Sequence, residues 1–155
     1  MARAGFTTIH SGQIRFGKDG RWYCDDEAVS NRAICRLYSR SITVLPDGTA
    51  RLEMGADKTG VLIEDTPWVV TMVERAPDGT FTVILNDETR EPLDPGSLRV
   101  GPEHVLYCRV KGGQHEARLL RPAYYELLRH AEPGPADECT LAVGGRRITI
   151  PARSE

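Results

Sequence analysis

Hydrophobic and polar residues alternate with a period of two along much of this chain, and the alternating runs come in pairs. The two runs of each pair are separated by Asp-Gly or Gly-Gly, at residues 19–20, 47–48, 78–79, 112–113 and 144–145. These dipeptides supply the positive-φ residues that a type I′ hairpin turn requires. The pattern therefore predicts five hairpins and a mostly antiparallel β protein.

Two segments break this alternation and have the 3.6-residue period of a helix. In residues 30–40, Ser30 is a good N-cap, and the apolar residues at helical spacing are Ala33, Ile34, Leu37 and Tyr38. In residues 122–131, Pro122 stands in the first turn, and the apolar stripe is formed by Tyr124, Leu127, Leu128 and Ala131. We expect one short helix in each segment.

The order hairpin, helix, hairpin occurs twice. The first copy is assigned to residues 13–56 and the second to residues 95–155, with residues 1–12 as an N-terminal extension. Residues 57–94 belong to neither copy and form a central acidic strand segment and a crossover. The sequence predicts an α+β fold with mostly antiparallel sheets, two short helices and an internally duplicated unit, its two lobes packed as one compact body.

The central segment contains the most apolar run of the chain. Residues 69–73 are apolar at nearly every position, so we expect both faces of that strand to be covered. Charge is also uneven here: the net charge is +2 over residues 1–56, −6 over 57–94 and +2 over 95–155. The acidic segment either faces its basic flanks in the fold or forms a solvated acidic surface.

Composition narrows the class of protein. The 155 residues carry a net charge of −2 and have a pI of about 6.1, which disfavours nucleic acid as a partner. No apolar run is long enough to span a bilayer, and the first residues lack the apolar core of a signal peptide, so we expect no membrane insertion and a cytoplasmic protein. The four cysteines are then expected to be reduced thiols, and without a CxxC pair they do not indicate a metal site.

Several short motifs together resemble a bacterial family known as domain of unknown function 1285 (DUF1285). They are, in the family's order, "IRFGKDGRW", "NRAICRLYSRSI", "VLIEDTPWVV", "NDETREPLDPGSLRV", "VLYCRVKGGQHEARLLRPAYYELL" and "LAVGGRRITI". The resemblance implies an α+β fold with an internal duplication, whose second half is similar to a pleckstrin-homology module. It also implies a partner bound near the seam between the halves and a role in signalling. It implies no catalytic residues.

The chain lacks the local signatures of common enzymes: no P-loop, GxGxxG, HExxH, GxSxG or EF-hand motif is present. Cys108 alternates with apolar neighbours and is interpreted as a core thiol. Cys24 precedes three acidic residues, which should raise its pKa and make it unreactive. The sequence therefore predicts neither a catalytic residue nor a metal or cofactor site.

Some polar residues stand where strands end, and they are the candidates for a binding site. Glu64 and Asp65 form a ligand- or arginine-binding corner, or Asp65 caps the Thr66-Pro67 turn. Asn86 and Asp87 are either turn formers or part of a mixed-charge recess with the arginines. The full set expected to converge at the seam is Trp22, Glu64, Asp65, Trp68, Asn86, Asp87, Arg109, Arg118 and Arg121.

Three functions remain open from the sequence. The first is a non-enzymatic binding or regulatory module that recognises a small anionic or peptide ligand, or a protein partner, at the seam. The second is a small enzyme of unknown reaction, with acid–base groups drawn from His115, Glu116, Tyr124 and Asp65. The third is a structural homo-oligomer that buries the strand "RITI" at residues 147–150, although the sequence does not set the oligomeric state.

Overall fold

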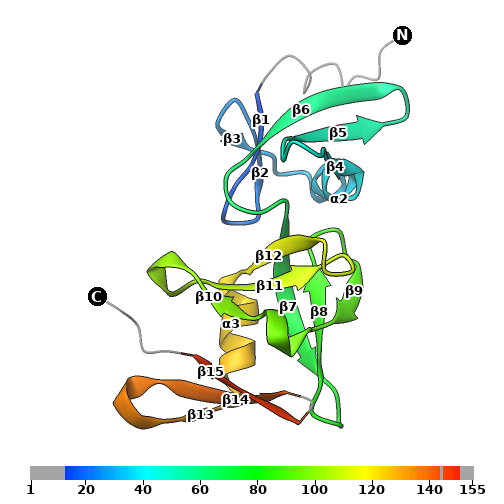
Figure 1. Ribbon diagram of the computed structural model, residues 1–155. Coiled ribbons are helices and arrows are strands. Elements are labelled where there is room, and N and C mark those ends of the chain that lie inside the picture. Colours follow the sequence, from blue (N-terminus) through cyan, green and yellow to red (C-terminus); the bar gives the residue numbers. More distant parts are fainter. Residues whose placement is uncertain (1–12, 144, 151–155) are drawn as a thin grey trace. The chain divides into compact units, whose positions relative to one another are not determined.

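The structure is a computed structural model that describes residues 13–143 and 145–150. The chain forms two compact units, Met1–Pro67 and Trp68–Glu155 (Figure 1). The described residues contain two α-helices and mostly antiparallel strands, which confirms the predicted α+β class.

The first unit is built on a six-stranded sheet. Its strands come in two groups of three, with α2 (Arg32–Ser41) between them in sequence. The groups are β1 (Ile14–Phe16), β2 (Trp22–Cys24) and β3 (Glu27–Ala28), then β4 (Ile42–Val44), β5 (Ala50–Met54) and β6 (Asp57–Ile63). The spatial order is β3-β2-β1-β6-β5-β4, and only the central pair, β1 and β6, is parallel.

Helix α2 begins one residue later than predicted because Asn31, not Ser30, is its N-cap. The Asn31 Oδ1 atom accepts hydrogen bonds from the N–H groups of Ala33 and Ile34, at 2.9 and 3.1 Å. The predicted apolar face is only partly correct, since Tyr38 is buried but Leu37 is exposed.

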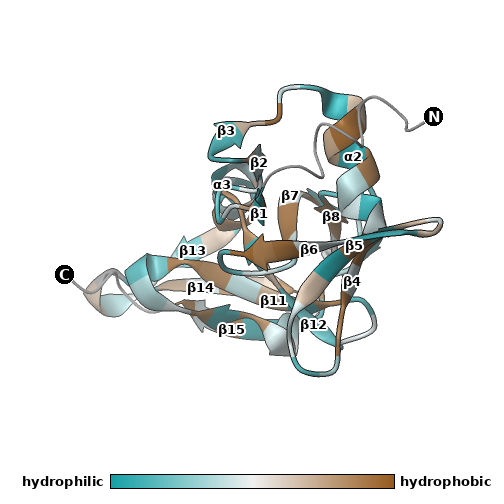
Figure 2. Cartoon of the chain, turned by 90° about the horizontal axis from the view of Figure 1, so that it is seen from above, coloured by the Kyte–Doolittle hydropathy of each residue, from teal (hydrophilic) through white to brown (hydrophobic). Residues whose placement is uncertain are grey.

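The second unit contains a second six-stranded sheet. It consists of β7 (Trp68–Arg75), β8 (Phe81–Leu85) and β9 (Arg90–Pro92), then β10 (Arg99–Val100), β11 (Leu106–Val110) and β12 (His115–Leu119). Short 3₁₀ turns, η1 (Pro95–Ser97) and η2 (Pro102–His104), lie before and after β10. The expected burial of the apolar run in β7 holds for Val69, Val70 and Val73, whereas Met72 is exposed. Figure 2 shows β7 and β8 as largely hydrophobic strands.

The C-terminal part of this unit adds a helix and a small sheet. Helix α3 (Arg121–Leu128) packs against β7, and β13 (Ala131–Pro133), the 3₁₀ turn η3 (Pro135–Asp137), β14 (Cys139–Val143) and β15 (Arg146–Ile150) follow. The helix is shorter than the predicted 122–131, because Ala131 pairs with Leu141 in the three-stranded sheet. No helix in the described residues is long and apolar enough to cross a membrane.

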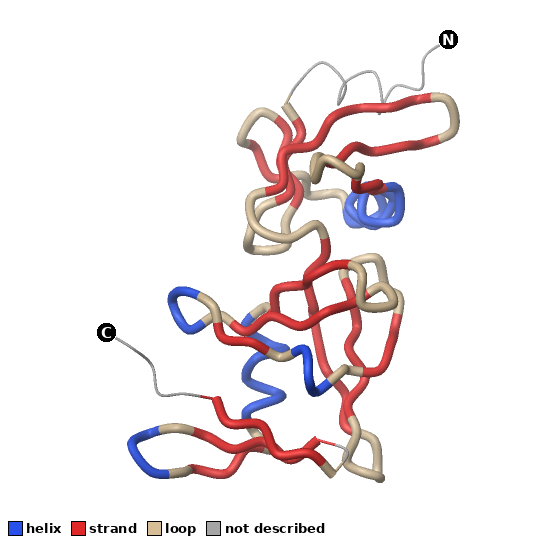
Figure 3. Tube along the Cα trace, viewed as in Figure 1, coloured by secondary structure: helices blue, strands red, loops and turns tan. Residues whose placement is uncertain are grey.

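All five predicted hairpins form (Figure 3). Three of their turns are not of the predicted type, because only the glycine of each Asp-Gly pair has a positive φ. In the β4–β5 turn the Gly48 N–H donates to the Leu45 carbonyl at 2.8 Å, and only Gly48 has a positive φ. A type I′ turn needs positive φ at both central residues, which Pro46 cannot adopt, so the turn is type I followed by a glycine bulge. The Gly112-Gly113 turn does have two positive φ values. Gly144 lies outside the described residues.

The two six-stranded sheets have the same topology, which supports the predicted duplication. Written from one edge, their orders are β3-β2-β1-β6-β5-β4 and β9-β8-β7-β12-β11-β10. In each sheet the first and last strands form the only parallel pair. The strand order thus equates residues 14–63 with 68–119, whereas the sequence pattern equated 13–56 with 95–155.

The side chains that face each other across the parallel strand pair differ in size between the two sheets. In the first sheet Ile14 lies opposite Val61, and in the second Trp68 lies opposite Ala117. Two medium side chains in one copy correspond to a large and a small one in the other. This exchange is typical of equivalent core positions that must fill similar space.

Candidate functional site

The nine residues expected at the seam are distributed over both units. Trp22, Glu64 and Asp65 belong to the first unit, and the remaining six belong to the second. The structure describes the surroundings of each residue within its own unit, and convergence of all nine at one seam stays a prediction.

Trp22 is a core residue of the first unit. Its side chain is almost fully buried, and its Nε1–H donates to the Ser39 Oγ atom at 3.0 Å. Its ring lies edge-on to Tyr38, with 5.3 Å between the ring centroids. The sequence could not distinguish this satisfied core tryptophan from a ligand-binding one.

Glu64, which follows β6, connects this strand to β1 and to the turn after β1. One carboxylate oxygen accepts from the Lys18 N–H at 2.9 Å, and the other accepts from the Arg15 guanidinium at 3.2 Å. Glu64 is therefore an arginine-binding residue, one of the alternatives that the sequence left open. Asp65, beside it, is exposed.

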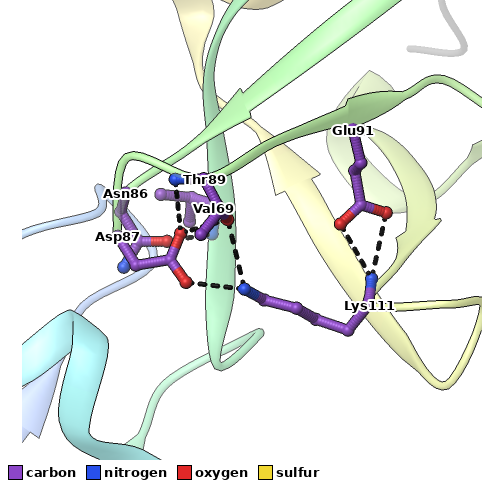
Figure 4. A network of polar contacts seen from close by, with 6 residues as sticks. All are labelled: Val69, Asn86, Asp87, Thr89, Glu91 and Lys111. Atoms are coloured by element: carbon purple, nitrogen blue, oxygen red, sulfur yellow. Dashed lines mark hydrogen bonds and ion pairs between the residues drawn. The ribbon is translucent and has the colours of Figure 1, made fainter.

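The second unit contains a polar network around Asp87 at the end of β8 (Figure 4). The Asp87 Oδ2 atom accepts from the Lys111 ammonium at 2.6 Å, and Oδ1 accepts from the Thr89 N–H at 3.1 Å and from its hydroxyl at 2.5 Å. The Asp87 side chain is 7% exposed. Burial alone would raise the pKa of Asp87, but the bonds from Lys111 and Thr89 outweigh it and lower the pKa below its usual value.

The same turn occurs twice more without the lysine. In the Pro-Asp-Gly-Thr turns, Asp47 accepts from the Thr49 N–H and hydroxyl, and Asp78 accepts in the same way from Thr80. Both aspartates are exposed, whereas Asp87 is buried beneath Lys111. The Asp87 turn thus combines a common turn geometry with a buried ion pair.

Lys111 contacts other residues besides Asp87. Its backbone N–H donates to both carboxylate oxygens of Glu91, at 3.0 and 3.1 Å, and its ammonium lies 5.3 Å from the centroid of the Trp68 ring. Lys111 and Glu88 both have positive φ values without being glycine, a conformation that costs free energy unless neighbouring contacts fix it. The network therefore joins the β8–β9 turn to the β11–β12 hairpin.

A cation that the sequence did not suggest, Lys111, is bound to Asp87. The expected mixed-charge recess of Asn86 and Asp87 with the arginines stays a prediction. Asn86 binds the backbone of Val69, both through its N–H and through its Oδ1 atom, and Arg118 lies opposite Val69 in the parallel ladder. The Arg121 guanidinium, at the start of α3, donates to the Tyr125 hydroxyl at 3.4 Å.

Arg109 lies exposed near the tip of the β11–β12 hairpin. Its Nε–H donates to the Gly113 carbonyl at 2.8 Å, which folds the side chain over the turn. Glu116 is opposite Arg109 in the ladder but is bound by the Arg99 guanidinium through two bonds. Among the described residues Arg109 therefore has no carboxylate partner, and its terminal NH₂ groups face solvent.

His115 stands beside these cations. Its ring lies against Trp68, with 4.8 Å between the ring centroids. Burial lowers the pKa of His115, and the positive charges of Arg109 and Lys111 lower it further, so the imidazole is neutral at pH 7. The ammonium of Lys111 and the neutral imidazole of His115 thus both lie near the Trp68 ring.

The residues proposed for acid–base chemistry do not form a pair in the second unit. His115 and Glu116 are consecutive residues of β12, so their side chains point to opposite faces of the sheet. Tyr124 lies on α3, with its ring 6.0 Å from that of His104. No group of three or more histidine, cysteine, aspartate or glutamate side chains that could hold a metal ion occurs in the described part of the chain.

The cysteines are free thiols. Cys108 is fully buried, as expected, and burial raises its pKa to about 12, with Glu91, Glu116 and Asp94 adding to the effect. Burial also raises the pKa of Cys24, and the neighbouring Asp25 and Glu27 raise it further, which confirms the predicted direction.

Sequence reasoning missed three residues of the network: Thr89, Glu91 and Lys111. The Asp-x-Thr spacing that recurs at residues 47, 78 and 87 was a usable signal for the turn. No local signal connects Lys111 with Asp87, because the contact depends on the pairing of β12 with β7.

Comparison with known proteins bears on the fold. No protein-family model matches the sequence, and neither does any curated protein. Two crystal structures are similar. A DUF1285 family protein from Silicibacter pomeroyi DSS-3 has a TM-score of 0.68 and 20% identity, over 90% of this chain and 80% of that one. A DUF1285 family protein from Shewanella baltica OS155 has a TM-score of 0.60 and 19% identity, over 77% and 93% of the two chains. The resemblance predicted from the motifs is thus confirmed in three dimensions: the chain has the fold of DUF1285 family proteins.

Proposed function

We propose that this protein is a non-enzymatic binding or regulatory module that recognises an anionic group, such as the acidic side chains of a peptide or protein partner. The proposed contact is the Arg109 guanidinium at the end of the β11–β12 hairpin, where Lys111 adds a second positive charge. One observation carries the proposal: the exposed Arg109 guanidinium has a fixed position but no carboxylate partner in the described structure.

The geometry suits a carboxylate or a phosphate. The bond from Nε–H to the Gly113 carbonyl fixes the plane of the guanidinium, and its two terminal NH₂ groups stay available for a bidentate contact. Because Glu116 is bound by Arg99, it does not neutralise Arg109 from across the ladder.

The Lys111 network supports this role by fixing the hairpin. Lys111 is anchored by Asp87 through its side chain and by Glu91 through its backbone, so the turn that carries Arg109 and His115 has a defined position. A binding site whose groups are already in place loses less conformational entropy when the ligand binds. A regulatory role in the cytoplasm is a further part of the proposal.

The test is a titration of the full chain with tetraglutamate at low ionic strength, followed by isothermal calorimetry, with tetralysine as the control peptide. Tetraglutamate should bind and tetralysine should not. Arg109→Ala should weaken binding about fivefold or more, which corresponds to ~1 kcal/mol. Arg75→Ala is the matched control, since Arg75 is an exposed arginine of the same unit at the other end of the sheet.

Two results would contradict the proposal. One is equal affinity of the wild type and Arg109→Ala for tetraglutamate. The other is the absence of any saturable binding of tetraglutamate or inorganic phosphate at millimolar concentration.

A further inference from the structure

The outer face of the sheet in the first unit carries a shallow groove of about 740 Å³. It crosses β5 and β6 beside the start of β1. Arg51 lies opposite Gly60 in the β5–β6 ladder, and the residues on either side of Arg51 along β5, Ala50 and Leu52, are buried, so Arg51 and Gly60 lie on the face away from the core. The residues that line the groove from this outer face are Leu45, Thr49, Arg51, Lys58, Gly60 and Leu62.

Gly60 forms the floor of the groove, and the fold does not require a glycine there. Its φ is not in the left-handed region, and a Cβ atom built on it would meet no heavy atom within 4 Å. Glycine inside a strand costs stability, and it often marks a place where another chain or a ligand comes close to the backbone. Here no described part of this chain makes that close approach.

The two flanks of the groove differ in chemistry. On one side Leu62 is 54% exposed and offers an apolar surface to a ligand. On the other side Lys58 is exposed and has no carboxylate partner among the described residues, whereas Arg51 is paired with Glu53. Figure 2 shows the same division along β6, which changes from hydrophilic at its start to hydrophobic at its end.

The openness of the groove favours a protein segment over a small molecule. Small-molecule sites are concave and bury most of the ligand surface. A small ligand in this shallow groove would keep much of its surface in water, whereas an extended segment can continue along the sheet face. The positive charge of Lys58 calls for an acidic side chain on that segment, and Leu62 calls for an apolar one.

We propose that this groove docks an extended segment of a partner protein, with its backbone passing over Gly60. An apolar side chain of the segment packs on Leu62, and an acidic side chain pairs with Lys58. This surface belongs to the first unit and is independent of the Arg109 site.

The test uses the ¹⁵N-labelled full chain and the peptide acetyl-Thr-Leu-Gly-Asp-Leu-Glu-Thr-amide as a probe. A second peptide with lysine in place of the two acidic residues is the control. We expect saturable shifts of the backbone amides of Lys58, Gly60 and Leu62 with the acidic peptide only.

Variants separate docking from folding. Gly60→Val fills the groove with a residue that suits a strand, so it should weaken binding of the acidic peptide about tenfold or more while the melting temperature stays the same or rises. Lys58→Glu should weaken binding about fivefold. Lys18→Glu, the same charge reversal in an exposed turn of the same unit, should leave it unchanged.

Several outcomes would overturn the proposal. Binding that is equal in the wild type and Gly60→Val, or no saturable shift at millimolar peptide, would show that the groove is not a docking site. A concentration-dependent dimer that Gly60→Val abolishes would assign the groove to a second copy of this chain. Amide shifts of residues 2–12 caused by Gly60→Val without peptide would assign it to the chain's own N-terminal segment.

Discussion

Asp87 shows how one buried contact changes the role of a common turn residue. Asp47, Asp78 and Asp87 each accept two hydrogen bonds from the threonine two positions later. Only Asp87 is buried and bound to a lysine. The three positions therefore form an internal comparison of the same turn with and without an ion pair.

Asp87→Asn should lower the free energy of unfolding by about 2 kcal/mol. The substitution leaves the Lys111 ammonium without its countercharge, and the loss is below that of a fully buried pair because Lys111 is partly exposed. Chemical denaturation measures the change. Asp47→Asn and Asp78→Asn are the controls, and they should lower the free energy of unfolding clearly less, because the second carboxylate oxygen of each aspartate is bound only by water. Equal losses at the three positions would contradict the argument.

The same pair predicts a dependence on pH. The folded structure holds the pKa of Asp87 below its ordinary value, so its contribution is complete above about pH 4 and is lost as the pH falls through the folded-state value. The stability difference between the wild type and Asp87→Asn should therefore shrink in acid. Urea denaturation at a series of pH values between neutrality and pH 3 checks this, and a difference that grew in acid would reverse the sign of the argument.

His115 titrates in a different range. Its pKa is lowered by burial and by the neighbouring cations, so the unfolded chain binds the proton more readily than the folded one. Stability should fall as the pH drops below about 6.5 and stop falling beneath the folded-state pKa. In an NMR titration, Arg109→Ala should move the pKa of His115 upward, while Arg75→Ala should not.

For single residues, the sequence predicted which side chains are buried better than it predicted which side chains contact one another. Alternation with apolar neighbours was enough to predict the buried Cys108. The cation that binds Asp87 could not be predicted, because Lys111 comes 24 residues later and meets it only through the pairing of β12 with β7.

At the scale of elements, short polar signals decide where each element begins. The N-cap of α2 is Asn31, whose Oδ1 atom binds two helical N–H groups, although Ser30 precedes it and is an equally good capping residue type. Asn31→Ala should lower the free energy of unfolding by about 1 kcal/mol, and Ser30→Ala should change it by less than about 0.5 kcal/mol. Thermal or chemical unfolding of the two variants measures the difference, and the reverse order would restore Ser30 as the cap.

The hairpins were predictable because their turn residues are explicit in the sequence. The short strands outside these hairpins were not: β3, β9, β10 and β13 have two or three residues each, and no Asp-Gly or Gly-Gly turn beside them marks their position. The type I′ expectation failed at residues 45–49 because Pro46, just before the Asp-Gly pair, fixes a negative φ at the first central position of the turn.

At the scale of the whole molecule, the duplication is visible in the strand order of the two sheets. The sequence showed that a unit is repeated but not which elements correspond, because hairpin, helix, hairpin describes both the first sheet and the last 60 residues. Only the pairing of the first strand with the last one fixes the correspondence of β1–β6 with β7–β12.

This correspondence predicts coupling between Trp68 and Ala117. Ala117→Val alone should cost about 1–3 kcal/mol, since it adds volume to a filled core opposite a tryptophan. Combined with Trp68→Ile, it reproduces the Ile14–Val61 pair of the first copy. The double variant should therefore lose less free energy of unfolding than the two single variants lose together, by at least about 0.5 kcal/mol. A double-mutant cycle measures this term, and additivity would argue against equivalent positions.

The parallel pair at the centre of each sheet also determines how the chain enters and leaves. Because β1 and β6 run in the same direction, the polypeptide comes in at one end of the pair and goes out at the other, and β7 and β12 repeat this arrangement. Copies of such a motif can follow one another along a gene with a connection as short as residues 64–67. A motif whose outgoing strand ran antiparallel to its incoming one would return the chain to its starting end and would need a longer return segment before the next copy could begin.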